Sequence, residues 1–188
     1  MLDVRWIGRL LSRVRAGDRH SAWNHAALLG VPEVISLRSD WFDDGRAMPL
    51  RSAGKGVGEN VSPPLSWDDV PDGTTEFALV MEDPDAPLPR PFVHLIAYGI
   101  PGELRNLPEG ALGHEGRSLR LGKSTIGSQG YMGPRPIPAH GPHHYVIQIL
   151  ALNRPTHFQS APNLKNFLKG VSGTVIGRGR LIGKFERQ

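Results

Sequence analysis

The sequence predicts a mainly β domain, residues 31–188, that follows an N-terminal helical extension, residues 1–30. Glycine and proline contribute 23 and 17 of the 188 residues and divide the chain into many short segments. This composition favours a β-rich fold over a helical bundle. Many of the segments are short runs of apolar, often β-branched residues bounded by turn residues. A chain of this length can bury one hydrophobic core, so we expect a single domain.

The extension is expected to begin with an amphipathic helix over residues 4–15. Its apolar residues recur at three- and four-residue steps, and its arginines occupy another face: Val4, Ile7, Leu11 and Val14 against Arg5, Arg9 and Arg13. Residues 21–29 are expected to form a second short helix that ends at Gly30. We expect the apolar stripe to pack on the domain or on a second copy in a homodimer. Contact with an anionic membrane surface is the alternative.

Five strands and one further helix are expected in the domain. The strands are residues 34–37, 77–81, 92–98, 145–152 and 174–185. The helix spans residues 162–169, with a proline near its start and Gly170 just past its end. The turn-rich stretches 43–75 and 101–143 are too long for simple connections, so we expect one or both to build a functional site.

Composition excludes several classes of function. The formal charge of +4 is modest and most basic residues are scattered, which argues against nucleic acid as a partner. The absence of cysteine excludes disulfides, thiolate catalysis, zinc ribbons and iron–sulfur clusters. No apolar run reaches the roughly 20 residues that span a bilayer, and the first residues lack the apolar core of a secretory signal. We therefore expect a cytoplasmic protein that needs no cofactor.

Two candidate binding residues lie at predicted strands: Asp83 follows one strand, and His94 lies inside the next. Asp83 comes directly after the strand 77–81 and before the turn 84–87, whose two prolines stiffen the backbone, so its carboxylate is well placed to face a cleft. Asp85 is suited instead to cap the local backbone. Strand alternation places the ring of His94 on the same face as Phe92 and Ile96. Taken alone, this ring is either a structural histidine bonded to a backbone carbonyl or a ligand group.

The third candidate segment is a loop followed by a strand. Residues 130–138 combine glycines with prolines, a composition suited to presenting backbone amides to phosphate or sulfate oxygens. In the strand that follows, His143 and Tyr145 share one face and His144 takes the other. We therefore expect His143, and not His144, to reach the pocket.

Taken in order, these motifs resemble the phosphatidylethanolamine-binding protein family, also called the Raf-kinase-inhibitor-like family, in its bacterial YbhB/YbcL-type branch. The resemblance covers about residues 34–188. It rests on Asn-Val-Ser-Pro-Pro-Leu-Ser-Trp at 60–67, Asp-Pro-Asp-Ala-Pro at 83–87, the strand around His94 up to Ile-Pro at 100–101, and the segment 130–145.

The resemblance implies an antiparallel β-sandwich with a few short helices. It also implies a non-catalytic protein that binds phosphate, phosphorylated head groups or similar small anions. The residues that it places around the pocket are Asp83, Pro87, His94, Gly133, Pro134, Arg135, Pro136, His143 and Tyr145. The loop 133–136 would supply backbone amides to the anion, and Pro87 would shape the wall. The alternative that the family allows is an inhibitor or regulator of a kinase or protease.

The chain departs from the family pattern at three positions. Leu95 replaces the usual tryptophan after the pocket histidine, Gly99 replaces an asparagine, and Ile137 replaces a proline. The first change is expected to widen or dry the pocket and so to affect the choice of ligand.

Two enzyme classes compete with a binding function. A metalloenzyme is the second alternative, because several residues offer nitrogen or oxygen ligands: Asp83, His94, His140, His143 and His144. A facial set of three would require distortion, since the last two point apart on a strand and His140 lies in a loop. A serine hydrolase has less support, because the chain has no Gly-x-Ser-x-Gly motif.

Overall fold

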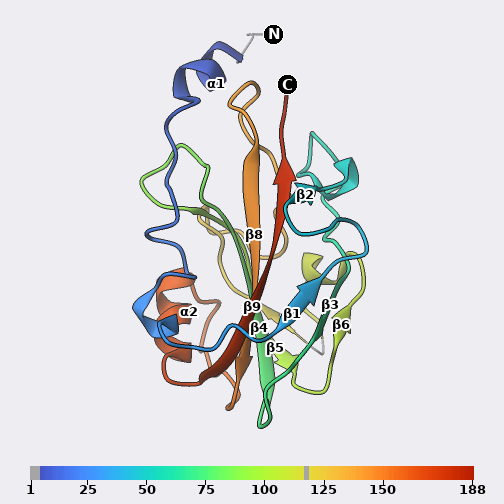
Figure 1. The fold of residues 1–188 in the computed structure, drawn as a ribbon, viewed down its shortest axis with the longest axis vertical. Helices are drawn as coiled ribbons and strands as arrows, with labels where there is room; N and C mark the ends of the chain where they lie inside the picture. The colour runs from blue at the N-terminus through green and yellow to red at the C-terminus, as the bar shows by residue number, and fades with distance from the viewer. Residues whose placement is uncertain (1–4, 117–118) are drawn as a thin grey trace.

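The computed structural model of the protein describes residues 5–116 and 119–188 and contains two facing β-sheets (Figure 1). The larger sheet holds, in spatial order, β2 (Arg46–Ala47), β9 (Val175–Phe185), β8 (His143–Leu152), β4 (Glu76–Asp83), β5 (Phe92–Pro101) and β7 (Arg120–Leu121). The smaller sheet holds β1 (Ser36–Arg38), β3 (Leu65–Asp68) and β6 (Asn106–Leu107). All pairs are antiparallel except β2 with β9. The predicted antiparallel β-sandwich is thereby confirmed.

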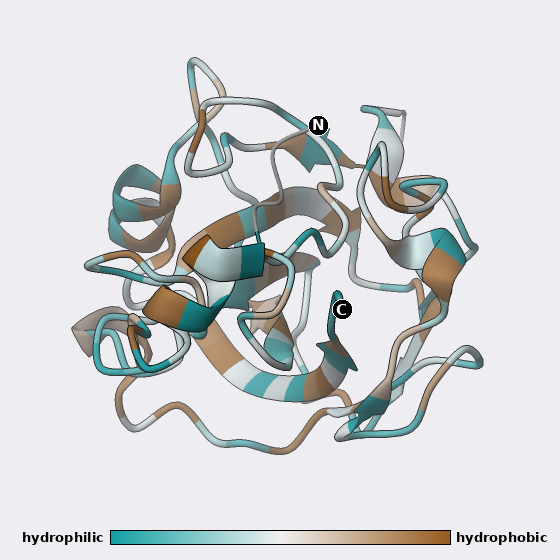
Figure 2. Cartoon of the chain, turned by 90° about the horizontal axis from the view of Figure 1, so that it is seen from above, coloured by the Kyte–Doolittle hydropathy of each residue, from teal (hydrophilic) through white to brown (hydrophobic). Residues whose placement is uncertain are grey.

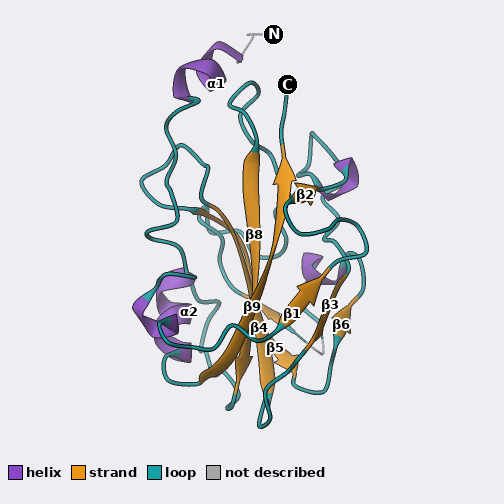
Figure 3. Ribbon diagram, viewed as in Figure 1, coloured by secondary structure: helices purple, strands orange, loops and turns teal. Residues whose placement is uncertain are grey.

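Short helices complete the structure (Figure 3). They are α1 (Arg5–Leu11), α2 (Leu164–Val171) and the 3-10 turns η1 (Ala26–Leu28), η2 (Leu50–Ser52) and η3 (Ala111–Gly113). Helix α2 is capped by the Asn163 side chain, which accepts a hydrogen bond from the Asn166 amide. It buries Phe167 and Leu168 against the larger sheet, whereas α1 lies beyond the sheet, at the end where both termini are found (Figure 1).

The central strand of the larger sheet, β4, is buried along its whole length. Its odd-numbered residues from Phe77 to Met81 face the smaller sheet, where the rings of Phe77 and Trp67 meet edge-on at 5.3 Å. Ala78 and Val80 face the opposite side, in the cluster that contains α2. Hydrophobic residues therefore line both faces, and bands of brown and teal alternate along the outer strands in Figure 2.

The expected strands are all present, with ends shifted by a few residues, but four short strands were not predicted. β2, β3, β6 and β7 contain two to four residues each, too few to show an alternating pattern. The predicted helix over residues 21–29 is wrong, because only η1 forms there. The amide of Ala22 instead donates to the Glu82 carboxylate across the fold, at 2.8 Å. The predicted helix over 4–15 ends at Leu11, and residue 4 lies outside the described residues.

Glu82 is a carboxylate inside the core on the α2 side of the sheet. It is 1% exposed, and its Oε2 accepts hydrogen bonds from the Ala22 amide and from Nε2 of Gln148, both at 2.8 Å. Its Oε1 has no hydrogen-bond partner in the described part of the chain. Burial raises the pKa of Glu82 from 4.5 to about 7, against the opposing effect of these two hydrogen bonds. Glu82 therefore links the extension to the sheet, although burial destabilises its charged form.

This raised pKa predicts how stability depends on pH. The folded protein retains the Glu82 proton up to about pH 7, whereas the unfolded chain loses it near 4.5. The protonated Glu82 therefore contributes fully to the stability of the fold below pH 4.5, and this contribution is lost as the pH rises through about 7. We expect Glu82→Gln to raise the free energy of unfolding by about 1–3 kcal/mol at about pH 8 and to change it little near pH 4. Urea denaturation at both pH values measures this, with the exposed Glu103→Gln as control. Equal stability of wild type and Glu82→Gln at pH 8 would contradict the assignment.

Candidate functional site

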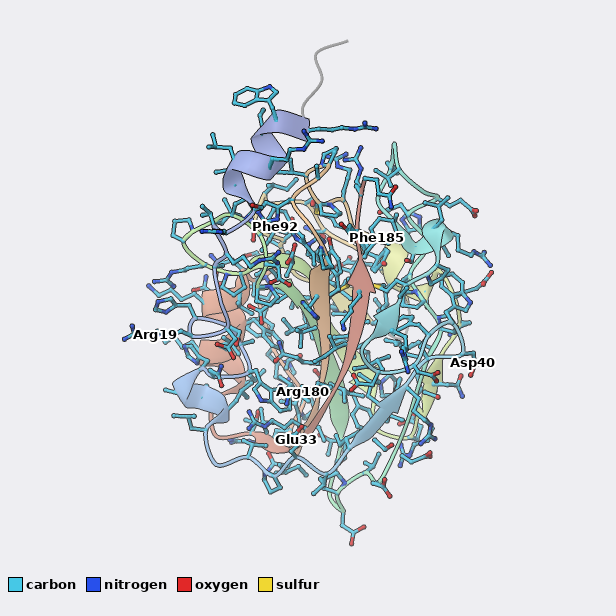
Figure 4. The ribbon with its side chains drawn as sticks, turned by 45° about the horizontal axis from the view of Figure 1, so that its top comes forward. Arg19, Glu33, Asp40, Phe92, Arg180 and Phe185 are labelled. Carbon is cyan, nitrogen blue, oxygen red and sulfur yellow. The ribbon has the colours of Figure 1, made fainter. Side chains whose placement is uncertain are left out.

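The candidate residues meet at the end of the larger sheet that lies nearest α1. Asp83 is the last residue of β4, and the strands on either side run antiparallel to it, so its neighbours are the first residues of β5 and β8. Phe92 pairs in register with Asp83, and Phe185 pairs with His143. Both phenylalanines are labelled in Figure 4, where they mark this end of the sheet.

His94 lies in a β-bulge of β5. Met81 pairs with Leu95 and Glu82 pairs with Val93, so His94 is an extra residue between two paired ones. Side-chain alternation is interrupted there: Leu95 belongs to the core between the sheets, while Val93 and Ile96 belong to the α2 side. The prediction that His94 shares a face with Ile96 is therefore wrong. The bulge turns its ring towards Tyr145 instead, with the two rings edge-on at 5.1 Å.

Asp83 and His143 form a buried hydrogen bond. Oδ2 of Asp83 and Nδ1 of His143 are 2.7 Å apart, and the two residues are 4% and 1% exposed. The other oxygen, Oδ1, accepts from the amide of Asp85 at 2.8 Å, which holds the carboxylate in place. His144 lies on the opposite face, as alternation predicts, where its amide and Nδ1 both contact Oδ2 of Asp85 at 2.7 Å.

Tyr145 brings a hydroxyl group that has no partner. The side chain is fully buried, and its hydroxyl makes no hydrogen bond with any described residue. The backbone of Arg135 faces this hydroxyl, although the contact does not meet hydrogen-bond geometry. Burial, and then the charge of Asp83, raise the pKa of Tyr145, so the hydroxyl stays protonated. A free donor is thus held inside the site.

The hydrogen bonds of His94 determine its tautomer. Its Nδ1 lies 2.7 Å from the carbonyl oxygen of Met132. Because a carbonyl only accepts, Nδ1 carries the proton, and Nε2 has a lone pair in the neutral ring. Burial lowers the pKa of His94, and the negative charge of Asp83 opposes that effect.

The loop 133–136 does not supply the row of free amides that the sequence suggests. The Gly133 amide donates to Oδ1 of Asn60 at 2.8 Å, and the two prolines have no N–H group. The Arg135 amide, which faces Tyr145, is the one remaining donor of this loop. The side chain of Arg135 is exposed and donates to the Lys55 carbonyl. Pro87 is half-buried in the turn that follows Asp83.

His140 joins the site and was considered from sequence only as a metal ligand. Its Nδ1 is 2.7 Å from Nε2 of His143, and its Nε2 is 2.7 Å from the backbone oxygen of Leu11 at the end of α1. Gly141, with φ of 96°, provides the turn that brings the two rings together. The spacing His-Gly-Pro-His was the available signal, but the partner in α1 is 129 residues away.

The Asp83–His143–His140 network holds one more proton than its neutral rings provide. Three hydrogen bonds, the last to the Leu11 carbonyl, require three protons. A carboxylate and two neutral imidazoles carry only two. Burial, and then the neighbouring His143, lower the pKa of His140. With one proton in each of these contacts the network as a whole is neutral, because the third proton balances the charge of the Asp83 carboxylate.

The extension covers this end of the sheet. Gly8 packs so closely on the loop before His143 that a Cβ there would lie 1.9 Å from the Pro138 oxygen. Arg15 contacts Oδ1 of Asp85 at 2.6 Å and the Pro142 carbonyl at 3.1 Å. The amides of the next two residues, 16 and 17, donate to the carbonyls of residues 86 and 84. Both loops that carry site residues are thus tied to the extension.

The candidate site is closed in this structure. Asp83, His94, His143 and Tyr145 are each 6% exposed or less. A cavity of about 210 Å³ lies instead at the smaller sheet, beside Leu65 and Leu107. A smaller one, of about 40 Å³, lies between the extension and Glu82. An occupant of the candidate site must therefore displace part of its cover.

The described residues offer neither a cluster of metal ligands nor a membrane-spanning helix. Among residues 5–116 and 119–188, no group of three or more histidine, aspartate or glutamate side chains is arranged to hold a metal ion. No helix in the same part of the chain is long and apolar enough to cross a membrane.

Comparison with known proteins identifies the family. The model of the phosphatidylethanolamine-binding protein family matches residues 38–186. The chain belongs to this family. The UPF0098 protein PH1269 of Pyrococcus horikoshii is 32% identical over 164 residues, which are 85% of this chain and 81% of that protein.

Two solved structures of the phosphatidylethanolamine-binding protein family place the chain with its bacterial members. The homologue CT736 from Chlamydia trachomatis has a TM-score of 0.74 and 29% identity, over 83% of this chain and 99% of that one. YbcL from Escherichia coli has a TM-score of 0.73 and 25% identity, over 82% and 99%. The family model begins at Arg38, so α1 and η1 lie outside the matched region.

One departure from the family pattern has a structural reason. Gly99 has φ of 73° and its amide donates to Oε1 of Glu76 at 2.8 Å. Glycine adopts this left-handed conformation without strain, and asparagine is among the few other residues that tolerate it. Leu95 is buried in the core between the sheets.

The proton count of the network predicts an NMR spectrum. We expect His143 to carry a proton on Nε2 near neutral pH, while Nδ1 of His140 is unprotonated and accepts it. In His140→Phe this acceptor is lost, and His143 should become a neutral ring with its proton on Nδ1, facing the Asp83 carboxylate. Ring ¹⁵N shifts of both proteins measure this directly. An unprotonated Nε2 of His143 in the wild type would refute the three-proton network.

Proposed function

We propose that this protein binds a small phosphate-bearing anion, or a phosphorylated head group, at the site formed by Asp83, His94, His143 and Tyr145, without catalysing a reaction. The observation that carries the proposal is the buried Tyr145 hydroxyl, which has no acceptor among the described residues. A buried donor without a partner is costly, and an anion oxygen would satisfy it. Membership of a family named for binding a phospholipid with a phosphate group supports the same ligand class.

Three donors are available to the proposed anion. They are the Tyr145 hydroxyl, the Arg135 amide that faces it, and Nε2 of His94 once that ring is protonated. Charge-assisted hydrogen bonds of this kind are the stronger ones in proteins. The nearby Asp83 carboxylate would repel an anion if it were alone, but the additional proton in its network offsets that charge.

The extension controls access to the proposed site. The Leu11 carbonyl holds His140, and Arg15 holds the loop that follows Asp83. Neither contact involves one of the groups that would donate to the anion. The extension can therefore move away from the rim of the site while Asp83, His94 and Tyr145 stay in their strands. We infer that ligand binding includes opening of this rim.

Substitution of Tyr145 provides the sharpest test of the site. We expect Tyr145→Phe to reduce affinity for phosphate and phosphoethanolamine by about tenfold. Stability should be nearly unchanged, because the hydroxyl makes no hydrogen bond with any residue that the structure describes. His94→Ala should weaken binding at least as much. Isothermal titration calorimetry compares them with His144→Ala, which changes the opposite face of β8 and should bind as the wild type does. Unchanged affinity in both Tyr145→Phe and His94→Ala would place the anion elsewhere.

The protonation of His94 predicts a pH dependence of binding. Burial lowers its pKa in the free protein, so the ring is neutral near pH 7 and must take up a proton to donate from Nε2. Affinity should then fall by up to about tenfold per pH unit as the pH rises. Sulfate is the suitable probe, because it does not titrate near neutral pH. In His94→Gln, whose amide can donate without titrating, the slope should disappear; a slope that persists there would assign the proton to another group.

A further inference from the structure

The outer face of α1 is apolar and exposed to solvent. Trp6 and Leu10 are 62% and 72% exposed, and Val14, just after the helix, is 48% exposed. At about 100° per residue, positions four apart lie on one side of a helix. Trp6 and Leu10 therefore lie on one face of α1, and most of the surface of both side chains is left uncovered by the described residues.

The contacts that orient α1 leave Trp6 and Leu10 exposed. Gly8, on the opposite side of the helix from Trp6 and Leu10, packs against the backbone around Pro138. The Leu11 carbonyl is bonded to His140, and Arg15 is bonded to Asp85. These contacts fix which face points inward, and the fold leaves the tryptophan and leucine on the outside. The apolar residues that do turn inward, Ile7 and Leu11, are only half-buried.

The charged residues of α1 and of the segment directly after it are all basic. Residues 5–17 contain four arginines and no aspartate or glutamate. Arg5, Arg9 and Arg13 are exposed, and the helical repeat places Arg5 and Arg9 beside Trp6 and Leu10. A helix with tryptophan and leucine on one face, flanked by arginine, has the composition of helices that lie in the interface of anionic bilayers.

The position of α1 suits contact with a flat surface. The helix projects past the ends of the strands at one end of the molecule (Figure 1). From these observations we propose that the outer face of α1, formed by Trp6, Leu10 and the flanking arginines, docks on an anionic membrane surface together with Val14, which lies just after the helix. Contact of this kind lies in the plane of the headgroups and needs no membrane-spanning segment.

A second copy of the chain fits this face less well. A two-fold contact would bring the arginines of one α1 against those of the other, and like charges repel. Three apolar side chains are also few beside the roughly 20–30 residues per side of a stable interface. Lipid head groups of negative charge complement the arginines directly.

Membrane docking would place the proposed anion site near the head groups. His140 joins the end of α1 to His143 and Asp83, so the site lies just behind the docked helix. The docking proposal is nevertheless independent of anion binding, because each is measured with a different ligand and a different set of variants.

Vesicle co-sedimentation of the full chain tests the proposal. We expect binding to vesicles of phosphatidylcholine with phosphatidylglycerol, and at least about tenfold weaker partitioning on phosphatidylcholine alone. The double variant Trp6→Ser/Leu10→Ser should lower partitioning on the anionic vesicles by about tenfold or more. Its control is Leu50→Ser/Ile126→Ser, which removes apolar side chains that are 63% and 67% exposed elsewhere and should bind as the wild type does.

A second pair of variants tests the charge. Arg9→Gln/Arg13→Gln should weaken binding to anionic vesicles, whereas Arg154→Gln/Lys165→Gln, with the same loss of charge at other exposed positions, should do so much less. Equal sedimentation of the wild type and Trp6→Ser/Leu10→Ser overturns the proposal. So does a wild-type dimer in light scattering that becomes monomeric in that variant, because the face would then belong to a second copy.

Discussion

The burial of β4 on both faces is the constraint on which the rest of the structure depends. A strand covered on both sides can carry a carboxylate only where that group is bonded or neutralised. The last two residues of β4 both carry carboxylates. Because side chains alternate along a strand, Glu82 lies on the α2 side of the sheet and Asp83 lies on the side of the smaller sheet. One oxygen of each carboxylate contacts long-range partners, so the end of this strand is connected to distant segments of the chain.

Both carboxylates hold the N-terminal extension. Glu82 accepts from the Ala22 amide on one face of the sheet, and Asp83 reaches the Leu11 carbonyl through His143 and His140 on the other. The extension therefore wraps over the end of the sheet and is attached on both sides of it. Both attachments of the extension depend on protonation. The contact with Glu82 depends on a carboxyl group whose pKa is raised, and the contact through His140 depends on a network with one proton in each of its three hydrogen bonds.

This arrangement brings the candidate site and the exposed face of α1 to the same end of the molecule. The unpartnered Tyr145 hydroxyl lies inside, the rings of His94 and His143 lie beside it, and the exposed apolar face of α1 lies outside. A segment outside the region matched by the family model thus covers the most polar part of the family domain. His140 physically connects the buried residues of the candidate site to the end of α1.

The sequence alone determined the long strands and the sides on which most of their residues lie. β4 and most of β8 are apolar runs, and side chains alternate between the two faces of a strand, which separated His143 from His144. Only the tertiary structure decided the rest. The bulge at His94 depends on pairing with β4, the Gly133 amide is taken by Asn60 from a distant loop, and His140 gains its role from a carbonyl in α1. Local propensity sets which segments become strands, but the partners of buried polar groups are set by which distant segments the core brings together.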